Sequence, residues 1–83
     1  MSGLNIDPKL RDDIIESLLG ISEVIQVSEV TGRFDILIST RARSLKEFHS
    51  LMLEKIGTIN GVKRSESFVE MKRTTKQTPY RQL

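Results

Sequence analysis

An internal repeat at an offset of 38 residues limits this chain to few architectures. When the sequence is shifted by that offset, apolar residues fall on apolar residues. The coinciding pairs are Leu10 and Phe48, Ile14 and Met52, Ile15 and Leu53, Leu18 and Ile56, Ile21 and Ile59, Val24 and Val62, and Val30 and Phe68. Each copy has the spacing of a helix followed by a strand. The repeat therefore predicts two similar helix–strand units that pack side by side.

Turn and capping residues divide the chain into six elements. Asp7-Pro8 begins the first helix, and Ser44 with Glu47 fits a capping box for the second. Gly20 suits a left-handed residue after the first helix, and Gly32 suits a hairpin turn. The predicted strands are 3–7, 23–30, 34–40 and 62–71. The order βαββαβ predicts an α+β fold of the ferredoxin-like αβ-sandwich type, in which two helices cover one face of a four-stranded antiparallel sheet.

Helical spacing predicts which side chains are buried. In the first helix the apolar stripe is Leu10, Ile14, Ile15 and Leu18. In the second helix the predicted buried side chains are Leu45, Phe48, Met52, Leu53 and Ile56. Both helices are expected on one side of the sheet, which leaves its second face uncovered.

Apolar residues occupy both parities of the middle strands. Phe34, Ile36 and Ile38 share one parity while Leu37 has the other; likewise Val24 and Val30 alternate with Ile25 and Val27. A half-exposed strand would instead alternate apolar and polar residues. A chain of 83 residues also buries only about 60–65% of its unfolded surface. We therefore predict that the open face packs on a second subunit, which gives a dimeric α+β barrel.

Composition excludes several kinds of chemistry. The chain has no Cys, and His49 is its only imidazole, so neither a zinc site of several imidazoles nor a catalytic residue is predicted. Phosphate-binding glycine motifs are missing, and we expect no cofactor. Three Phe, one Tyr and no Trp are few for a domain that stacks bases on its strands, so direct nucleic-acid binding is not expected.

The positive charge is concentrated at the end of the sequence. Lys72, Arg73, Lys76 and Arg81 lie in a polar stretch, whereas the first 70 residues carry nine basic and eleven acidic side chains. We predict a folded domain over 1–72 and a basic, flexible tail over 73–83. No apolar run is long enough for a membrane helix, and no signal peptide is recognised, so we expect a cytoplasmic protein with no membrane partner.

The hairpin stretch 30–35 is the segment most suggestive of a ligand. Gly32 explains the turn, but a carboxylate at Asp35 is unfavourable within a strand and requires a partner such as an ammonium group. Backbone N–H groups around Thr31 and Gly32 could accept a carboxylate. A free amino acid carries both groups, so it is the ligand that this pattern favours.

The order of short motifs resembles the effector-binding (RAM) domain of the Lrp/AsnC transcription regulators. The matching stretches are Ser22-Glu23-Val24, the hairpin 30–37, Arg43-Ser44-Leu45-Lys46-Glu47 and Ile59-Asn60-Gly61-Val62 with the strand entry to Ser67. The resemblance covers about residues 3–72. It implies the same sandwich, dimerisation through the sheet, assembly to higher oligomers up to octamers, and amino acids bound between dimers.

The resemblance also implies site residues and partners. Carried over, the ligand contacts are Thr31, Gly32, Arg33 and Asp35, with Ser65 and Ser67 on the last strand. Asp35 would bind the amino group and the turn N–H groups the carboxylate. Arg33 replaces another residue common in the family, which affects selectivity. A free amino acid is the implied effector, and full-length Lrp/AsnC regulators are possible partners.

The family's regulators carry a helix-turn-helix ahead of this domain, whereas seven residues precede the first helix here. We therefore expect a stand-alone effector domain, or a fragment, that modulates transcription regulation. Besides a pure assembly role with no ligand, two alternatives remain open. One is an amino-acid-binding module of the ACT type, which would show a Gly-rich entry to the first helix. The other is a small dimeric α+β barrel enzyme, which would require more His, Tyr or Trp.

Overall fold

The computed structural model describes residues 1–68 and Thr74. Its elements are β1 (Ser2–Ile6), a short turn η1 (Pro8–Leu10), α1 (Arg11–Leu19), β2 (Val24–Glu29), β3 (Ile36–Thr40), α2 (Leu45–Ser50), a π-helical turn η2 (Leu51–Ile56) and β4 (Val62–Ser67). The predicted domain boundary at 72, the tail apart from Thr74, and the strand end at Met71 lie outside the described residues.

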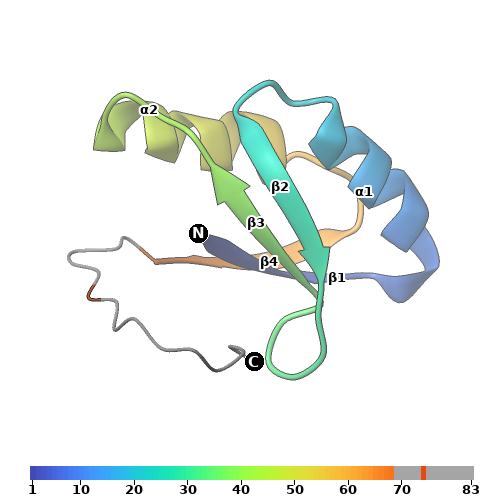
Figure 1. Ribbon diagram of the computed structural model, residues 1–83. Coiled ribbons are helices and arrows are strands. Elements are labelled where there is room, and N and C mark those ends of the chain that lie inside the picture. Colours follow the sequence, from blue (N-terminus) through green and yellow to red (C-terminus); the bar gives the residue numbers. More distant parts are fainter. Residues whose placement is uncertain (69–73, 75–83) are drawn as a thin grey trace.

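The strands form one antiparallel sheet in the order β2-β3-β1-β4, and both helices lie on the same side of it (Figure 1). This confirms the ferredoxin-like αβ-sandwich. At the start of β1, Met1 and Phe68 exchange backbone hydrogen bonds, with Phe68 N donating to Met1 O at 2.8 Å and Met1 N donating to Phe68 O at 3.2 Å. The ladder between β1 and β4 therefore extends one pair beyond the strand ends.

The first helix begins as predicted but ends differently. The Asp7 carboxylate accepts a hydrogen bond from Lys9 N at 3.0 Å, and Pro8 occupies the first turn. Gly20 adopts right-handed helical geometry, with φ −79°, so the predicted left-handed cap is wrong. Positive φ angles occur instead at the two turn glycines, Gly32 and Gly61, among the described residues. Gly61 has a second constraint, because a Cβ there would lie 2.8 Å from Leu10 Cδ1.

The capping box of the second helix is confirmed for one of its two hydrogen bonds. Ser44 Oγ accepts from Glu47 N at 3.1 Å, as the box predicts. The reciprocal bond is shifted by one residue, because Glu47 Oε2 accepts from Arg43 N at 3.0 Å and not from the N–H of Ser44. The carboxylate therefore ties down the segment that precedes the helix.

The predicted buried face of the second helix is partly wrong. Met52 and Ile56 are buried and Phe48 is half-buried, but Leu45 and Leu53 are 61% and 75% exposed. Leu51 is buried in place of Leu53. Successive helical residues are about 100° apart, so these two leucines flank Met52 on opposite sides, and spacing alone does not select between them. The wide turn closes with Gly57 N donating to Met52 O at 2.7 Å, five residues back.

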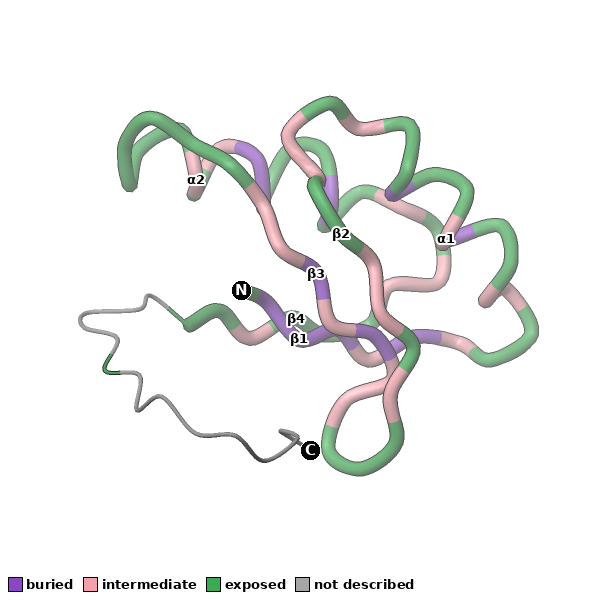
Figure 2. The backbone as a smooth tube through the Cα atoms, viewed as in Figure 1, coloured by how far each residue is buried: buried purple, intermediate pink, exposed green. Residues whose placement is uncertain are grey.

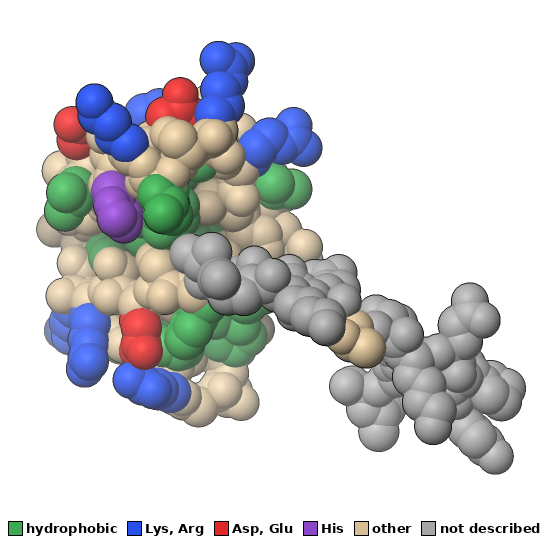
Figure 3. Space-filling view, turned by 90° about the vertical axis from the view of Figure 1, so that its left-hand side faces the viewer, with side chains coloured by type: hydrophobic (Ala, Val, Ile, Leu, Met, Phe, Trp, Pro, Cys, Tyr) green, Lys and Arg blue, Asp and Glu red, His purple; other side chains and the backbone are tan. Residues whose placement is uncertain are grey.

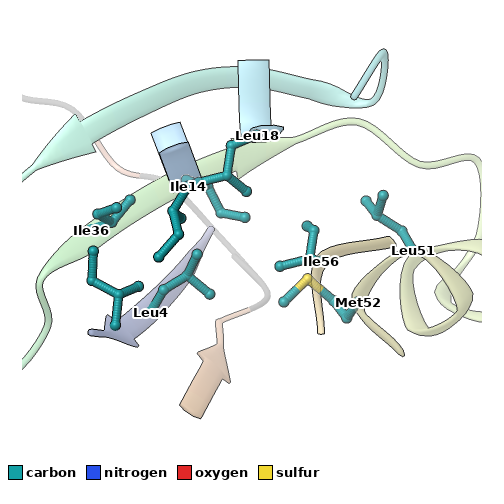
Figure 4. Close-up of a cluster of buried hydrophobic side chains, with 9 residues drawn as sticks. Leu4, Ile14, Leu18, Ile36, Leu51, Met52 and Ile56 are labelled. Atoms are coloured by element: carbon teal, nitrogen blue, oxygen red, sulfur yellow. The ribbon is translucent and has the colours of Figure 1, made fainter. Parts of the chain in front are cut away.

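The core lies between the sheet and the two helices (Figure 4). Figure 2 shows the buried residues concentrated on β1, on β3 and on the inner sides of the helices. The buried apolar residues of the core are Leu4, Ile6, Ile14, Leu18, Ile36, Ile38, Leu51, Met52 and Ile56. Burial of one such side chain contributes roughly 1.5–3 kcal/mol. Most apolar positions of the 38-residue repeat thus meet across one core, and the exceptions are Val30, Leu53 and Phe68.

A β-bulge changes the assignment of faces in β2. Val24 pairs with Thr40 and Gln26 with Ser39, so Ile25 is an extra residue in the ladder. The register shift turns both Val24 and Val27 toward the helices, where they pack on the core. The prediction that Val24 and Val27 face opposite sides is therefore wrong, and Val27 adds no apolar area to the open face.

Candidate functional site

The hairpin loop between β2 and β3 is closed by a backbone hydrogen bond. Val30 N donates to Asp35 O at 3.1 Å, which brings the two ends of the loop together. Gly32 has φ +115°, a conformation that residues with a Cβ rarely adopt. Thr31, Gly32 and Arg33 are exposed at the tip. Four of the six predicted site residues, Thr31, Gly32, Arg33 and Asp35, lie in this loop.

Asp35 links the hairpin to the central strand. Its backbone N donates to Leu4 O at 2.9 Å, and its Oδ2 accepts from Ile6 N at 2.9 Å. The ladder between β1 and β4 shifts register between Asn5 and Ile6, and the carboxylate caps the N–H at that irregularity. β3 starts only at Ile36, so the acidic residue precedes the strand and is not inside it. The half-buried carboxylate has a second oxygen for a ligand.

Arg33 contributes its main chain and its side chain to different contacts. Asn5 Nδ2 donates to Arg33 O at 2.9 Å. The guanidinium lies 2.8 Å from Glu66 Oε2, measured from Nη2, and its Cζ lies 5.5 Å from the centroid of the Phe34 ring. The Glu66 oxygen is buried and lacks hydrogen-bond geometry, so the contact is an ion pair. Arg33 thereby holds the loop against β4.

Phe34 lies across the open face of the sheet. A Cβ built on Gly3 would lie 2.5 Å from Phe34 Cγ, so only a glycine admits the ring this close. The ring also meets Phe68 edge-on, with centroids 6.1 Å apart and planes at 77°. The prediction that Phe34 shares the direction of Ile36 and Ile38 is wrong, because those two side chains are in the core. A glycine within a predicted strand is the signal that could have indicated this close approach.

The two serines of β4 lie away from the hairpin contacts. Ser65 pairs with Leu4 and Ser67 with Ser2, so both side chains share the helix-covered side of the sheet. Ser67 Oγ is 2.9 Å from Ser2 Oγ, and Ser2 Oγ donates to Met52 Sδ at 3.8 Å. Within one chain the structure therefore separates the serines from Arg33 and Glu66, which lie on the open side.

A hollow lies between the hairpin and the start of α1. Its volume is about 590 Å³, and its lining comprises Arg11, Glu29, Val30 and Thr31. Arg11 Nη1 lies 3.3 Å from Glu29 Oε1, which places a guanidinium beside the hairpin. Sequence reasoning missed Arg11, because its place on the first helix gives no sign that it lies next to the loop.

Residues 1–68 give little support to a metal site or to a catalytic histidine. No group of three or more His, Cys, Asp or Glu side chains that could hold a metal ion occurs in that range or at Thr74. His49 is exposed on α2, with its ring 6.0 Å from that of Phe48. The hairpin therefore remains the candidate site. Its groups are backbone N–H donors, the Asp35 carboxylate and the guanidinium groups of Arg11 and Arg33, which are paired with Glu29 and Glu66.

Comparison with known proteins gives a family match over most of the chain. A family model described as the Lrp/AsnC ligand binding domain matches residues 2–80. The chain belongs to this family. An uncharacterised HTH-type transcriptional regulator of Pyrococcus furiosus is 29% identical over 66 residues, which are 80% of this chain and 45% of that protein. The chain thus spans about half the length of that relative, and the family is one of transcriptional regulators.

Solved structures share the fold of this Lrp/AsnC domain. AsnC of E. coli superposes with a TM-score of 0.84 at 22% identity, covering 93% of this chain and 52% of that one. A Thermus thermophilus protein, TTHA0845, gives 0.82 at 19% identity, covering 90% of this chain and 94% of that one. The regulator NMB0573 of Neisseria meningitidis, solved as an L-Met complex, gives 0.74 at 22% identity, covering 93% of this chain and 53% of that one.

None of the helices in the part of the chain that the structure describes is long and apolar enough to cross a membrane.

Proposed function

We propose that this Lrp/AsnC ligand-binding domain senses a free amino acid at its hairpin and assembles through the open face of its sheet. The observation that carries the proposal is the half-buried Asp35 carboxylate, held beside the exposed Gly32 turn. Asp35 would bind the ammonium group, while backbone N–H groups at Thr31 and Gly32 would bind the carboxylate. The L-Met complex of the Neisseria neighbour supports an amino acid as the ligand class.

The contacts divide the roles of the predicted residues. Because the Arg33 guanidinium is paired with Glu66, Arg33 would act mainly by fixing the loop, and its selectivity role would be indirect. Ser65 and Ser67 would reach a ligand only from the other side of the sheet or from another subunit. Arg11, beside Thr31, is also paired with an acid, Glu29, so it would reach the ligand carboxylate only by exchanging that partner.

Assembly is proposed to begin with a homodimer. The open face carries Phe34, Phe68 and the half-buried Leu37, with Ile25 57% exposed at the bulge. A second copy would bury this apolar area and bring two hairpins to one interface. Higher assembly, up to an octamer, would then place sites between dimers, and ligand binding would shift the population of assemblies.

In the cell, the domain would act as a sensor or modulator of transcription regulation. Its curated relatives are HTH-type regulators, and the described residues form the ligand-binding domain only. Co-assembly with full-length Lrp/AsnC regulators would give it access to DNA through a partner. A cytoplasmic location follows from that role. The ACT-type module and the barrel enzyme are not favoured by any contact described above.

Calorimetry of the full chain with each of the twenty amino acids tests the ligand proposal. We expect binding by at least one, weakened about tenfold or more by Asp35→Asn. The amide oxygen can still accept from Ile6 N, so this variant keeps the fold while it loses the charge. Asp12→Asn, which removes an exposed acid on α1, is the matched control. No binding at millimolar concentration, or equal binding by both variants, would refute the site.

Light scattering with and without the binding amino acid tests assembly. A mass of at least two chains at micromolar concentration is expected, and a dependence of mass on ligand supports the sensor role. A mass of one chain under both conditions would rule out assembly through the sheet.

A further inference from the structure

A second cavity lies at the end of the sheet opposite the hairpin, where β2 begins and β3 ends. Its volume is about 440 Å³, within the range of small-molecule sites. One wall is the start of β2, a second is the segment 41–43 after β3, and the third is the side of α2 and η2. Leu51, which belongs to the core, also lines it, so the cavity reaches down to the apolar interior.

The segment 41–43 is held at both ends by hydrogen bonds. Arg41 N donates to Glu23 O at 2.8 Å, and Arg43 N donates to Glu47 Oε2 at 3.0 Å. Two guanidinium groups therefore extend from a fixed stretch of backbone two residues apart. Because this backbone is already fixed, binding removes less conformational freedom than it would from two arginines on a loose loop.

The acidic side chain at the start of β2 is already paired. Lys55 Nζ lies 2.8 Å from Glu23 Oε2 and 3.1 Å from Oε1, and Ser22 Oγ donates to Oε1 at 2.8 Å. The hydrogen bond from Lys55, followed by that from Ser22, lowers the pKa of Glu23 from 4.5 to about 2. At neutral pH the Glu23 and Lys55 charges therefore offset one another, and the pair braces β2 against η2.

The remaining cations of the cavity lining are Arg41, Arg43 and Lys46. Among the described residues, no ion pair joins Arg41, Arg43 or Lys46 to a carboxylate. Glu47 accepts from a backbone N–H, and Glu54 is the other acid in the lining. Figure 3 shows Lys and Arg side chains at the top of the face that includes α2, with Asp and Glu side chains among them, and the cavity lining itself has four basic and three acidic residues. This end of the domain therefore has an excess of positive charge, although the first 70 residues together are acidic.

We propose that this cavity binds the oxyanion group of a small molecule, a phosphate or a carboxylate, between the side chains of Arg41, Arg43 and Lys46. Guanidinium groups match both oxyanions through paired N–H donors, and Lys46 adds a point charge. Glu54 also lines the cavity, and its charge opposes the binding of anions. The site is separate from the hairpin and does not depend on the amino-acid proposal.

Amide NMR titration of the full chain at constant ionic strength tests the site, with inorganic phosphate in one arm and acetate in the other. We expect saturable shifts at residues 23, 41–47 and 54–55, and the arm that saturates first identifies the oxyanion. Arg41→Ala and Arg43→Ala should each weaken binding about tenfold. Glu54→Gln should strengthen it, because it removes the opposing charge.

Lys63→Ala, which removes an exposed cation from β4, is the matched control and should leave the titration unchanged. Three outcomes would overturn the proposal. They are shifts confined to residues after 68, shifts spread evenly over all basic residues, and equal weakening by Arg43→Ala and Lys63→Ala. A normal spectrum of each variant before titration excludes misfolding as the cause of lost binding.

Discussion

Replacement of Gly3 by alanine tests how tightly the hairpin is packed on the sheet. The new Cβ would lie 2.5 to 2.6 Å from three atoms of the Phe34 ring, well inside ordinary contact distance. The ring must then move, and it is tied to Phe68 at 6.1 Å and to the Arg33 guanidinium at 5.5 Å. Overpacking costs roughly 1–3 kcal/mol, and loss of the aromatic pair about 0.5–1.5 kcal/mol. Reduced freedom of the unfolded chain offsets about 0.5–1 kcal/mol.

We therefore expect Gly3→Ala to lower the free energy of unfolding by about 1–3 kcal/mol, measured by urea denaturation at one fixed protein concentration. Gly20→Ala is the control, since that residue has right-handed geometry and its nearest Cβ contact would be 3.4 Å away. It should be neutral or stabilising by up to about 1 kcal/mol.

A double-mutant cycle identifies the cause of the loss. In a Phe34→Ala background the ring is gone, so Gly3→Ala should cost little or nothing, and the coupling energy should be about 1–3 kcal/mol. The same penalty in both backgrounds would refute the packing argument, because the loss would then come from the strand itself. A penalty below about 0.5 kcal/mol in the native background would show that the ring swings away freely.

Three further predictions concern single positions. Leu51→Ala should lower the free energy of unfolding by about 2–5 kcal/mol and Leu53→Ala by less than about 0.5 kcal/mol, because only Leu51 is buried. Equal losses for the two variants in chemical denaturation would contradict the helix orientation. Gly32→Ala should lower the free energy of unfolding by about 1–3 kcal/mol. The loss comes from the φ of +115° alone, since no atom lies within 4 Å of the added Cβ. An unchanged unfolding midpoint would mean that the loop adopts another conformation. The pKa of Glu23 is lowered from 4.5 to about 2 in the folded protein, so the stability that its charge contributes is complete above pH 4.5 and is lost as the pH falls toward about 2. The difference in unfolding free energy between the native protein and Glu23→Gln should therefore vanish over that pH range. A difference independent of pH would exclude the ion pair as its source.

The fold was predictable because its signals are local and repeated. The 38-residue repeat indicated the element order, and Asp7, Ser44 and Gly32 marked boundaries. The errors in side-chain direction arose where periodicity has no unique solution. Leu51 and Leu53 flank the same buried methionine, and the bulge at Ile25 moves Val27 to the other face. Neither a wide helical turn nor a bulge changes composition, so sequence spacing does not reveal them.

The candidate site was predictable only in part. The Thr31 to Asp35 stretch stands out because a glycine turn and an acid interrupt an apolar strand. Its supports were not predictable, since Asn5, Glu66 and Phe68 come from strands far away in sequence. Register decides which residues of β4 meet the loop, and it placed Glu66, not Ser65 or Ser67, on the open side. Such pairings depend on three strands at once.

The backbone pairing of Met1 with Phe68 determines where a segment fused ahead of Met1 begins. Adjacent strands lie about 4.8 Å apart, so a segment fused ahead of Met1 begins beside the backbone of Phe68. Fusion would turn the terminal amine into a peptide N–H, which can still donate to the Phe68 carbonyl. A reporter attached ahead of Met1 would therefore begin next to Phe68, at the aromatic edge of the open face. An affinity tag placed there could compete with a second subunit, and assembly is best measured after such a tag has been removed.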